Sequence, residues 1–140
     1  MITEVKFYDQ VEDELLKFAV IAARHEGKWV FCKHRERVTF EIPGGHREAG
    51  ESIIETAKRE LYEETGALQF TIAPVCVYSV KRTDREESFG MLFYAEVQTF
   101  EKELHSEIEK IVFSEKMVDA WTYPQIQPRL LEEIQRREIE

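Results

Sequence analysis

Residues 44–67, GGHREAGESIIETAKRELYEETGA, determine how the rest of this chain is interpreted. The stretch begins with glycines and continues as a run rich in carboxylates. Ser52 and Glu55 have the spacing of a capping box, in which each side chain bonds the other's backbone N–H, and Gly66 is of a type that ends helices. The stretch therefore predicts a glycine-rich loop and a helix of about fourteen residues that begins at Ser52.

The predicted helix has an apolar face and a neighbouring acidic face when its residues are spaced at about 100°. The apolar face comprises Ile53, Ile54, Ala57 and Leu61. Glu60, Glu63 and Glu64 gather in the last two turns, where like charges repel and the helix macrodipole adds to the cost. Mg²⁺ prefers oxygen ligands and typically takes one or two carboxylates together with water and phosphate oxygens. The acidic face therefore predicts a metal site.

The same stretch resembles the signature of the Nudix hydrolases, Gly-x5-Glu-x7-Arg-Glu-aliphatic-x-Glu-Glu-x-Gly-aliphatic. The matching residues are Gly45, Glu51, Arg59, Glu60, Leu61, Glu63, Glu64 and Gly66. Ala67 departs from the pattern, because a larger aliphatic residue is usual there, and this departure concerns packing rather than chemistry. The resemblance implies an α/β/α sandwich with a mixed sheet between helices.

The resemblance also implies a set of metal ligands for Mg²⁺, with Mn²⁺ as a substitute. These ligands are the carbonyl oxygen of Gly44 and the carboxylates of Glu60, Glu63, Glu64 and Glu107. Glu107 is chosen because the family commonly adds a carboxylate from the loop after a long hairpin, and this residue stands where that loop re-enters the sheet. Glu101, Glu103 and Glu109 are the other glutamates of that loop. Which carboxylate acts as the general base stays open.

Two further residues of the signature, Arg59 and Glu51, have a plain and a functional interpretation. Arg59 is either an ordinary ion-pair partner of Glu63 or the group that fixes a ligand carboxylate. Glu51 precedes a helix N-terminus, where the macrodipole favours a negative charge. In the family its counterpart orients the arginine, and both interpretations of Glu51 are compatible.

Substrate-binding residues are less clearly marked in the sequence. Lys33 and Arg35 are expected to contact phosphate, with Lys81 and Arg82 as the other basic candidates. The histidines are expected at the surface: His25, His34, His46 and His105. Aromatic residues that could stack on a base, but that also suit a core, are Phe7, Tyr8, Phe40, Tyr78 and Trp121. The chain has no Asn, so a side-chain amide that reads a purine edge would come from Gln125 or Gln127.

Composition indicates one domain spanning residues 1–140. The chain has 43% hydrophobic residues, enough for one core, and a net charge of −9, which argues against a nucleic-acid polymer as partner. Cys32 and Cys76 lie in apolar runs and are expected as buried free thiols. No signal peptide and no apolar run near ~18 residues is visible, which indicates a cytoplasmic protein without a membrane span. The expected partner is a small nucleotide, and a homodimer is left open.

The hydropathy pattern predicts strands on both sides of the central helix. The predicted strands are residues 4–8 (an edge strand), 17–24, 29–33, 38–42, 70–80, 89–97 and 110–113, of which 70–80 and 89–97 form a long hairpin. Pro74 marks an edge or a bulge. A closing helix after Pro124 and Pro128 buries Leu130, Leu131 and Ile134. This order of elements predicts an α/β sandwich.

The predicted activity is metal-dependent hydrolysis of a pyrophosphate bond in a nucleoside diphosphate linked to a group X. The leading substrate is an oxidised nucleoside triphosphate such as 8-oxo-dGTP, which would give a nucleoside monophosphate and pyrophosphate. Nucleotide sugars and dinucleoside polyphosphates are alternative substrates. The alternative classes are a nucleotide-sensing module without catalysis, a small structural domain that binds calcium or magnesium, and a non-hydrolytic Nudix relative.

Overall fold

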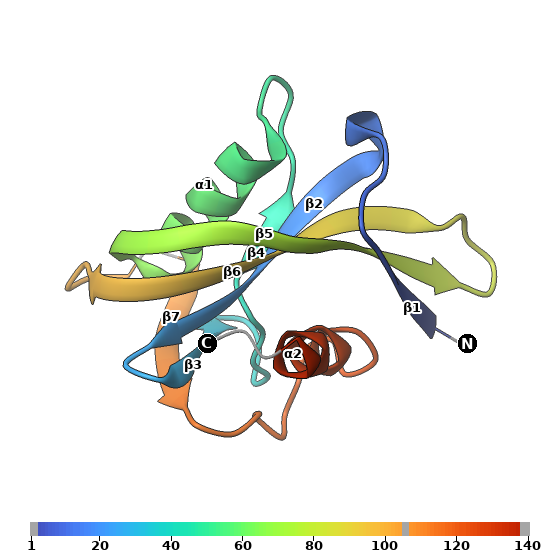
Figure 1. Cartoon of the computed structure of the whole chain (residues 1–140). Coiled ribbons are helices and arrows are strands. Elements are labelled where there is room, and N and C mark those ends of the chain that lie inside the picture. Colours follow the sequence, from blue (N-terminus) through green and yellow to red (C-terminus); the bar gives the residue numbers. More distant parts are fainter. Residues whose placement is uncertain (1–2, 105–106, 138–140) are drawn as a thin grey trace.

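The computed structural model describes residues 3–104 and 107–137, which form a seven-stranded sheet with helices on both faces (Figure 1). The strands are β1 (Thr3–Tyr8), β2 (Leu16–His25), β3 (Lys28–His34), β4 (Gly44–His46), β5 (Ala67–Arg82), β6 (Ser88–Phe100) and β7 (Ile108–Ser114). The helices are η1 (Asp13–Leu15), a single 3₁₀ turn, and the α-helices α1 (Ile53–Thr65) and α2 (Gln127–Arg136). Within the described residues, no helix is both long and apolar enough to cross a membrane.

The sheet is mixed, as the resemblance implied. Its strand order is β1-β5-β6-β2-β3-β7, with β4 paired to β2 off this path. β2 and β6 run parallel, whereas β5 and β6 form the predicted long antiparallel hairpin. β1 lies at one edge, as expected for residues 4–8. The predicted α/β sandwich is confirmed.

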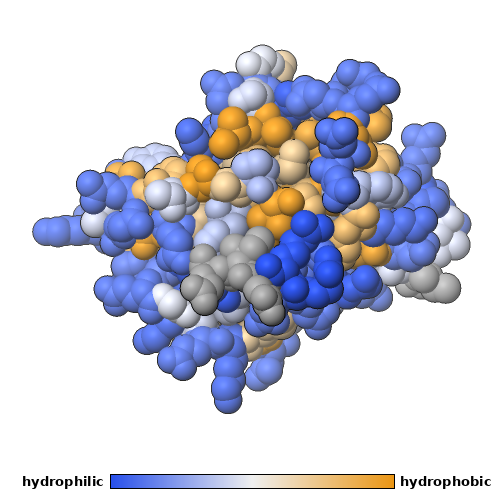
Figure 2. Space-filling view, viewed as in Figure 1, coloured by the Kyte–Doolittle hydropathy of each residue, from blue (hydrophilic) through white to orange (hydrophobic). Residues whose placement is uncertain are grey.

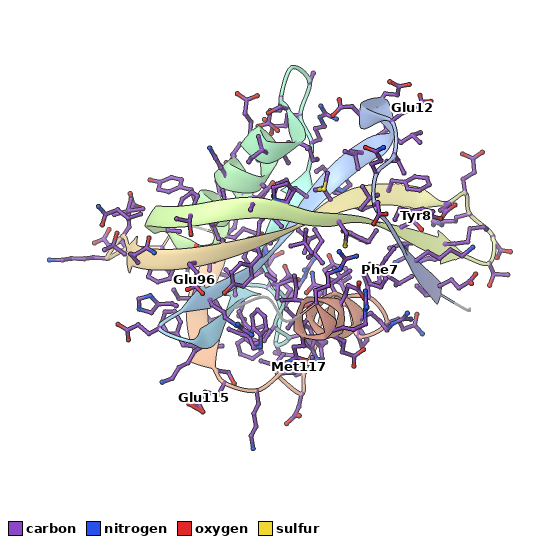
Figure 3. All side chains as sticks on the ribbon, viewed as in Figure 1. Phe7, Tyr8, Glu12, Glu96, Glu115 and Met117 are labelled. Atoms are coloured by element: carbon purple, nitrogen blue, oxygen red, sulfur yellow. The ribbon has the colours of Figure 1, made fainter. Side chains whose placement is uncertain are left out.

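Two apolar clusters lie on opposite faces of the sheet, one beneath each α-helix. Ala57 and Leu61 of α1 belong to one cluster, and the three predicted apolar residues of α2 belong to the other. Phe7 and Met117, labelled in Figure 3, pack against the α2 cluster. Hydrophilic side chains dominate the rim of the face shown in Figure 2, consistent with a highly charged chain.

The position of β2 between the two apolar clusters explains why its sequence is an almost unbroken apolar run. Ala19 and Ile21 face the α1 cluster, whereas Val20 and Ala22 face the α2 cluster, and all four are buried. A strand covered on both faces needs apolar residues at every position. β2 therefore lies in the interior of the sheet, where it pairs with β3, β4 and β6.

The predicted strand at residues 38–42 is wrong, and the glycines after it are not a simple loop. Residues 38–42 contribute only single bridges, from Glu41 to Cys32 and from Phe40 to Trp121, and Val38 is 84% exposed. Gly44 instead pairs with Val20 as part of β4. A Cβ on Gly44 would lie 2.6 Å from the carbonyl oxygen of Ala19, so only glycine permits this close approach.

The predictions for Pro74 and for the two cysteines hold. The register of β5 against β6 shifts between Pro74 and Cys76, which is the irregularity predicted for that proline. Pro74 also lies outside the part of β5 that pairs with β1. Cys32 and Cys76 are both buried and free. The closing helix is present, but it begins at Gln127 and has Pro128 in its first turn, whereas the sequence placed its start after Pro128.

Candidate active site

Helix α1 is fixed at both ends by the residues that the sequence singled out. The Ser52 hydroxyl accepts from the Glu55 N–H at 3.2 Å, and the Glu55 carboxylate accepts from the Ser52 N–H at 2.8 Å. Gly66 has φ 76° and ends the helix in the left-handed conformation. Because Leu61 is fully buried against the sheet, the carboxylates on the neighbouring face lie at the boundary between core and solvent.

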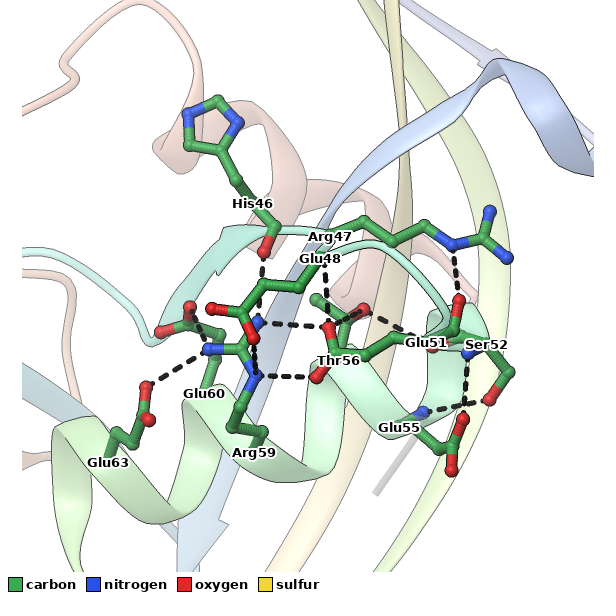
Figure 4. A network of polar contacts seen from close by, with 10 residues as sticks. All are labelled: His46, Arg47, Glu48, Glu51, Ser52, Glu55, Thr56, Arg59, Glu60 and Glu63. Atoms are coloured by element: carbon green, nitrogen blue, oxygen red, sulfur yellow. Dashed lines mark hydrogen bonds and ion pairs between the residues drawn. The ribbon is translucent and has the colours of Figure 1, made fainter.

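Arg59 is the centre of a polar network on this boundary (Figure 4). Its guanidinium donates to both carboxylate oxygens of Glu51, at 2.6 and 3.1 Å, and to the carbonyl oxygen of His46 at 3.0 Å. It also donates to Glu60 at 2.9 Å and to Glu63 at 3.1 Å. The Arg59 hydrogen bonds, followed by the Glu48 N–H, lower the pKa of Glu51 to about 2. Arg59 thus ties the loop before α1 to the acidic face of the helix.

Glu60 lies against the backbone of β4. A Cβ on Gly45 would overlap the Glu60 carboxylate, so glycine at this position makes room for that side chain. Burial raises the pKa of Glu60, although Arg59 partly offsets the effect. Glu63 differs, since its side chain is 49% exposed and its contact to Arg59 is on the solvent side.

Glu64 is the most buried carboxylate of the helix's acidic face, with a side chain 12% exposed. One carboxylate oxygen accepts from the Gly44 N–H at 2.8 Å. Burial, opposed by this hydrogen bond and reinforced by Glu60 and Glu41, raises the pKa of Glu64 to about 8. A buried carboxylate short of positive partners is the environment that a bound cation stabilises. The donor set at α1 and β4 therefore fits the divalent ion that the resemblance implied.

His34 and Glu41 join this site, and sequence reasoning missed both. The Nε2 atom of His34 lies 2.7 Å from Glu41 and 3.1 Å from Glu64. The expected surface position of His34 is wrong, because its side chain is only 22% exposed. No sequence spacing reveals these contacts, since they form only when the chain after β3 folds back over the end of α1.

The other histidines divide between the core boundary and the surface. His25 is partly buried, with Nδ1 2.8 Å from the carbonyl oxygen of Val97 and its ring against Phe100 and Phe113, so its predicted surface position is also wrong. His46 is exposed, as predicted. His105 lies outside the described residues.

A cavity of about 410 Å³ opens between β4, the end of α1 and the start of α2. Its polar lining includes His34, Arg37, Glu41, Glu64, Arg82 and Gln127. Its apolar lining includes Phe18, Ile42, Tyr78, Val80, Ile126 and Leu130. A volume of this size, with apolar walls and a few polar groups, suits a small organic ligand.

Lys33 and Arg35, the two basic residues expected to contact phosphate, do not line this cavity. Lys33 donates to Glu109 at 2.7 Å, and its side chain is 12% exposed. Arg35 lies at an adjacent opening with Arg37 and Glu107. Arg37 and Arg82 are the arginines that line the cavity itself, and of these only Arg82 was a candidate.

Glu107 lies beside the candidate site, at the edge of β7. Its carbonyl oxygen accepts from the Arg35 N–H at 3.0 Å, and its side chain is exposed. Its carboxylate is not part of the His34, Glu41 and Glu64 group, whose ligand atoms lie within 4.8 Å of one another. A role for Glu107 as a metal ligand therefore stays a prediction.

The wall contributed by α2 includes one candidate for reading a base. Gln127 is 6% exposed, and its side-chain oxygen accepts from the Ile42 N–H at 2.9 Å. Tyr78 lines the cavity, whereas Phe7, Phe40 and Trp121 pack on the α2 cluster and the Tyr8 hydroxyl donates to Glu87. Sequence reasoning missed two aromatic side chains of the lining, Phe18 and Tyr123.

The fold and the acidic helix define a protein of the Nudix class, and comparison with known proteins agrees. The profile of the NUDIX domain matches residues 14–135, so this chain belongs to the Nudix hydrolase family. A Bacillus subtilis (strain 168) protein named "Putative 8-oxo-dGTP diphosphatase YtkD" is 30% identical over 100 residues. That alignment covers 71% of this chain and 62% of YtkD, less than two thirds of the relative.

Solved structures show the same fold at low sequence identity. A mutant of the Bacillus subtilis pyrophosphohydrolase BsRppH is 22% identical, with a TM-score of 0.79 over 98% of this chain and 92% of that one. A C. elegans Ap4A hydrolase is 16% identical, with a TM-score of 0.66 over 87% of this chain and 98% of that one. These similarities support the architecture, and they leave the substrate to be argued from the site.

Proposed function

We propose that this protein hydrolyses a pyrophosphate bond in a substrate of the form nucleoside diphosphate linked to X. The observation that carries the proposal is the pair of partly buried carboxylates, Glu60 and Glu64, held over Gly44 and Gly45 beside the cavity. A divalent ion such as Mg²⁺, bound by Glu60, Glu63, Glu64 and the Gly44 carbonyl, would polarise phosphoryl oxygens and lower the pKa of a water molecule. Mn²⁺ suits the same oxygen ligands.

The protein's own residues supply position and charge. Arg59 holds Glu51, Glu60 and Glu63 in fixed relation, while the Gly44 N–H orients Glu64. Carboxylates that orient one another through an arginine keep metal ligands in a productive geometry. The general base is one of the glutamates beside the cavity.

The cavity walls favour a nucleoside as the part of the substrate that is buried. Phe18 and Tyr78 offer aromatic surface, and Arg37 and Arg82 offer positive charge for phosphate oxygens. Hydrolysis of a nucleoside triphosphate would join a water oxygen to the α-phosphorus and break its bond to the bridging oxygen of pyrophosphate. The products would be a nucleoside monophosphate and pyrophosphate.

The substrate we favour is an oxidised guanine nucleotide such as 8-oxo-dGTP. The name of the relative YtkD supports this choice at 30% identity. Gln127 supports it as well, because its oxygen is occupied by the Ile42 N–H and its amide nitrogen remains the group that could donate to a carbonyl oxygen of the base.

A substrate panel with Mg²⁺ tests the reaction and the substrate separately. We expect kcat/KM for 8-oxo-dGTP to exceed that for dGTP by at least ~10-fold, about 1.4 kcal/mol. A ratio near one would remove this substrate, and faster cleavage of a nucleotide sugar or a dinucleoside polyphosphate would replace it. Cleavage of no compound in the panel, with all nucleotide products separated by chromatography, would overturn the hydrolytic function.

The variant Gln127→Glu sharpens the test of the base. Glutamate keeps an oxygen for the Ile42 N–H but removes the amide donor, so the scaffold contact survives while a contact to the base does not. We expect the ratio of kcat/KM for 8-oxo-dGTP over dGTP to fall toward one. Gln125→Glu serves as the matched control, since Gln125 is exposed and lies outside the cavity lining.

A further inference from the structure

His34, Glu41 and Glu64 converge at one point of the cavity wall. The two oxygens of Glu64 have separate neighbours: one accepts from the Gly44 N–H, and the other lies 3.1 Å from Nε2 of His34. Glu41 lies on the other side of the imidazole, 2.7 Å from the same nitrogen. One nitrogen and two carboxylate oxygens thus meet where β3, the segment before β4 and the end of α1 come together.

The spacing of these atoms suits a shared cation. Divalent ions bind imidazole nitrogen and carboxylate oxygen at about 2.0–2.2 Å, so neighbouring ligands of an octahedral ion stand roughly 3 Å apart. The separations of 2.7 and 3.1 Å at His34 match that value. All three ligand atoms lie within 4.8 Å of one another.

The nitrogen of His34 also lacks a satisfactory partner. Nε2 is buried, and although two carboxylates are near it, neither makes a hydrogen bond of acceptable geometry. A buried polar atom without a hydrogen bond destabilises the folded protein, and a coordinated cation would remove that cost. The atom therefore points to a missing ligand.

Carboxylate oxygens lie on two sides of the imidazole. Arg37 donates to the second oxygen of Glu41 at 2.8 Å, which leaves the other Glu41 oxygen directed at His34. This Glu41 oxygen and the Glu64 oxygen beside His34 are of the ligand type that divalent cations bind.

We propose that His34, Glu41 and Glu64 form a second cation site that selects a first-row transition-metal ion over Mg²⁺. Glu64 is shared between this site and the carboxylate cluster of α1. The imidazole nitrogen determines the selectivity, because Mg²⁺ prefers oxygen ligands whereas Mn²⁺ and later ions accept nitrogen. The site does not depend on the proposed hydrolysis, since binding alone defines it.

Electron spin echo spectroscopy of the Mn²⁺-loaded protein tests the proposal. Mn²⁺ is paramagnetic, and an imidazole nitrogen bound to it produces a characteristic ¹⁴N modulation. We expect this modulation in the wild type in the presence of excess Mg²⁺, and its loss in His34→Gln. The matched control is His46→Gln, which removes an exposed histidine that lines the same cavity and should leave the modulation intact.

Calorimetric titration with Mn²⁺ provides a second readout. Glu41→Gln keeps the imidazole and removes one carboxylate ligand, so Mn²⁺ affinity at this site should fall at least ~10-fold. Glu36→Gln, a nearby exposed carboxylate, should leave the affinity unchanged.

Two outcomes would overturn the second site. One is Mn²⁺ bound to the wild type without ¹⁴N modulation, a result that does not depend on how any variant folds. The other is modulation that persists in a folded His34→Gln protein or disappears in His46→Gln. Either outcome leaves the substrate assay untouched, so failure of this site and failure of the proposed hydrolase function are distinguishable.

Discussion

The two ends of α1 hold glutamates with opposite electrostatic properties. Glu51, just before the helix, bonds Arg59 through both oxygens, and its pKa falls to about 2. Glu64, in the last turn, lies among other carboxylates with a single backbone N–H as donor, and its pKa rises to about 8. The same side chain is thus firmly ionised at one end and reluctant to ionise at the other.

This difference separates residues that build the site from residues that await a ligand. A carboxylate already satisfied by an arginine has little to gain from a cation, whereas a buried one without a counter-charge has much to gain. We therefore expect Glu51 to act through Arg59 and Glu64 to contact the metal directly. The following predictions test that division, from the largest effect to the smallest.

Glu64→Gln should produce the largest loss. We expect kcat/KM to fall at least ~10³-fold, about 4 kcal/mol of transition-state stabilisation, because the amide cannot bind the metal as a carboxylate does. Steady-state kinetics on the best substrate of the panel measures the loss. The control Glu132→Gln removes an exposed carboxylate of α2 and should retain wild-type activity. An active Glu64→Gln enzyme would contradict the direct contact between Glu64 and the metal.

Glu107→Gln tests whether a residue beside β7 contacts the metal in addition to Glu64. If Glu107 is the additional ligand, kcat should fall at least ~10²-fold, about 2.7 kcal/mol, while the fold stays intact. Glu103→Gln is the matched variant from the same loop. A loss of activity in Glu103→Gln with none in Glu107→Gln would transfer the role to Glu103.

Glu51→Gln should have a smaller effect, since Glu51 acts through Arg59. We expect kcat to fall roughly 10-fold with little change in KM, because the variant loses the orientation of a metal ligand and keeps the ligand itself. Glu48→Gln is the control, as that exposed carboxylate lies 3.8 Å from the same guanidinium and should change kcat less than ~2-fold. A larger loss in Glu51→Gln than in Glu64→Gln would reverse the comparison.

Saturating Mg²⁺ should raise the melting temperature of the wild type. At ~100 times its dissociation constant the ion adds ~2.7 kcal/mol, which for a domain of this size is about 10 °C. Glu64→Gln should lose most of that rise. Equal melting temperatures of the wild type in EDTA and in Mg²⁺ would show that the cluster does not bind this ion in the free protein.

Without metal, the stability cost of Glu64 should depend on pH. Its folded pKa of about 8 lies above the ordinary value of 4.5, so the folded state is not penalised below about pH 4.5, and its stability falls as pH rises from there through 8. In EDTA, Glu64→Gln should therefore melt close to the wild type at pH 5 and about 5 °C higher at pH 8. A difference that is independent of pH would contradict the raised pKa.

The sequence predicted most of the scaffold because the relevant signals are local. The capping box at Ser52 and the glycine at Gly66 bound α1 as expected, and the continuous apolar run of β2 indicated a strand covered on both faces. The strand predicted at residues 38–42 is wrong because alternation of apolar and polar residues indicates a strand but does not provide a neighbouring strand to pair with. Pairing there is limited to single bridges.

The sequence by itself determined that α1 has one apolar and one acidic face, because helical spacing fixes which side chains share a face. It also determined the contact between Arg59 and Glu63, one turn apart on that helix. Only the tertiary structure decided that His34 and Glu41 lie beside Glu64. These contacts join segments far apart in the chain, and their geometry depends on how β3, β4 and α1 pack around β2.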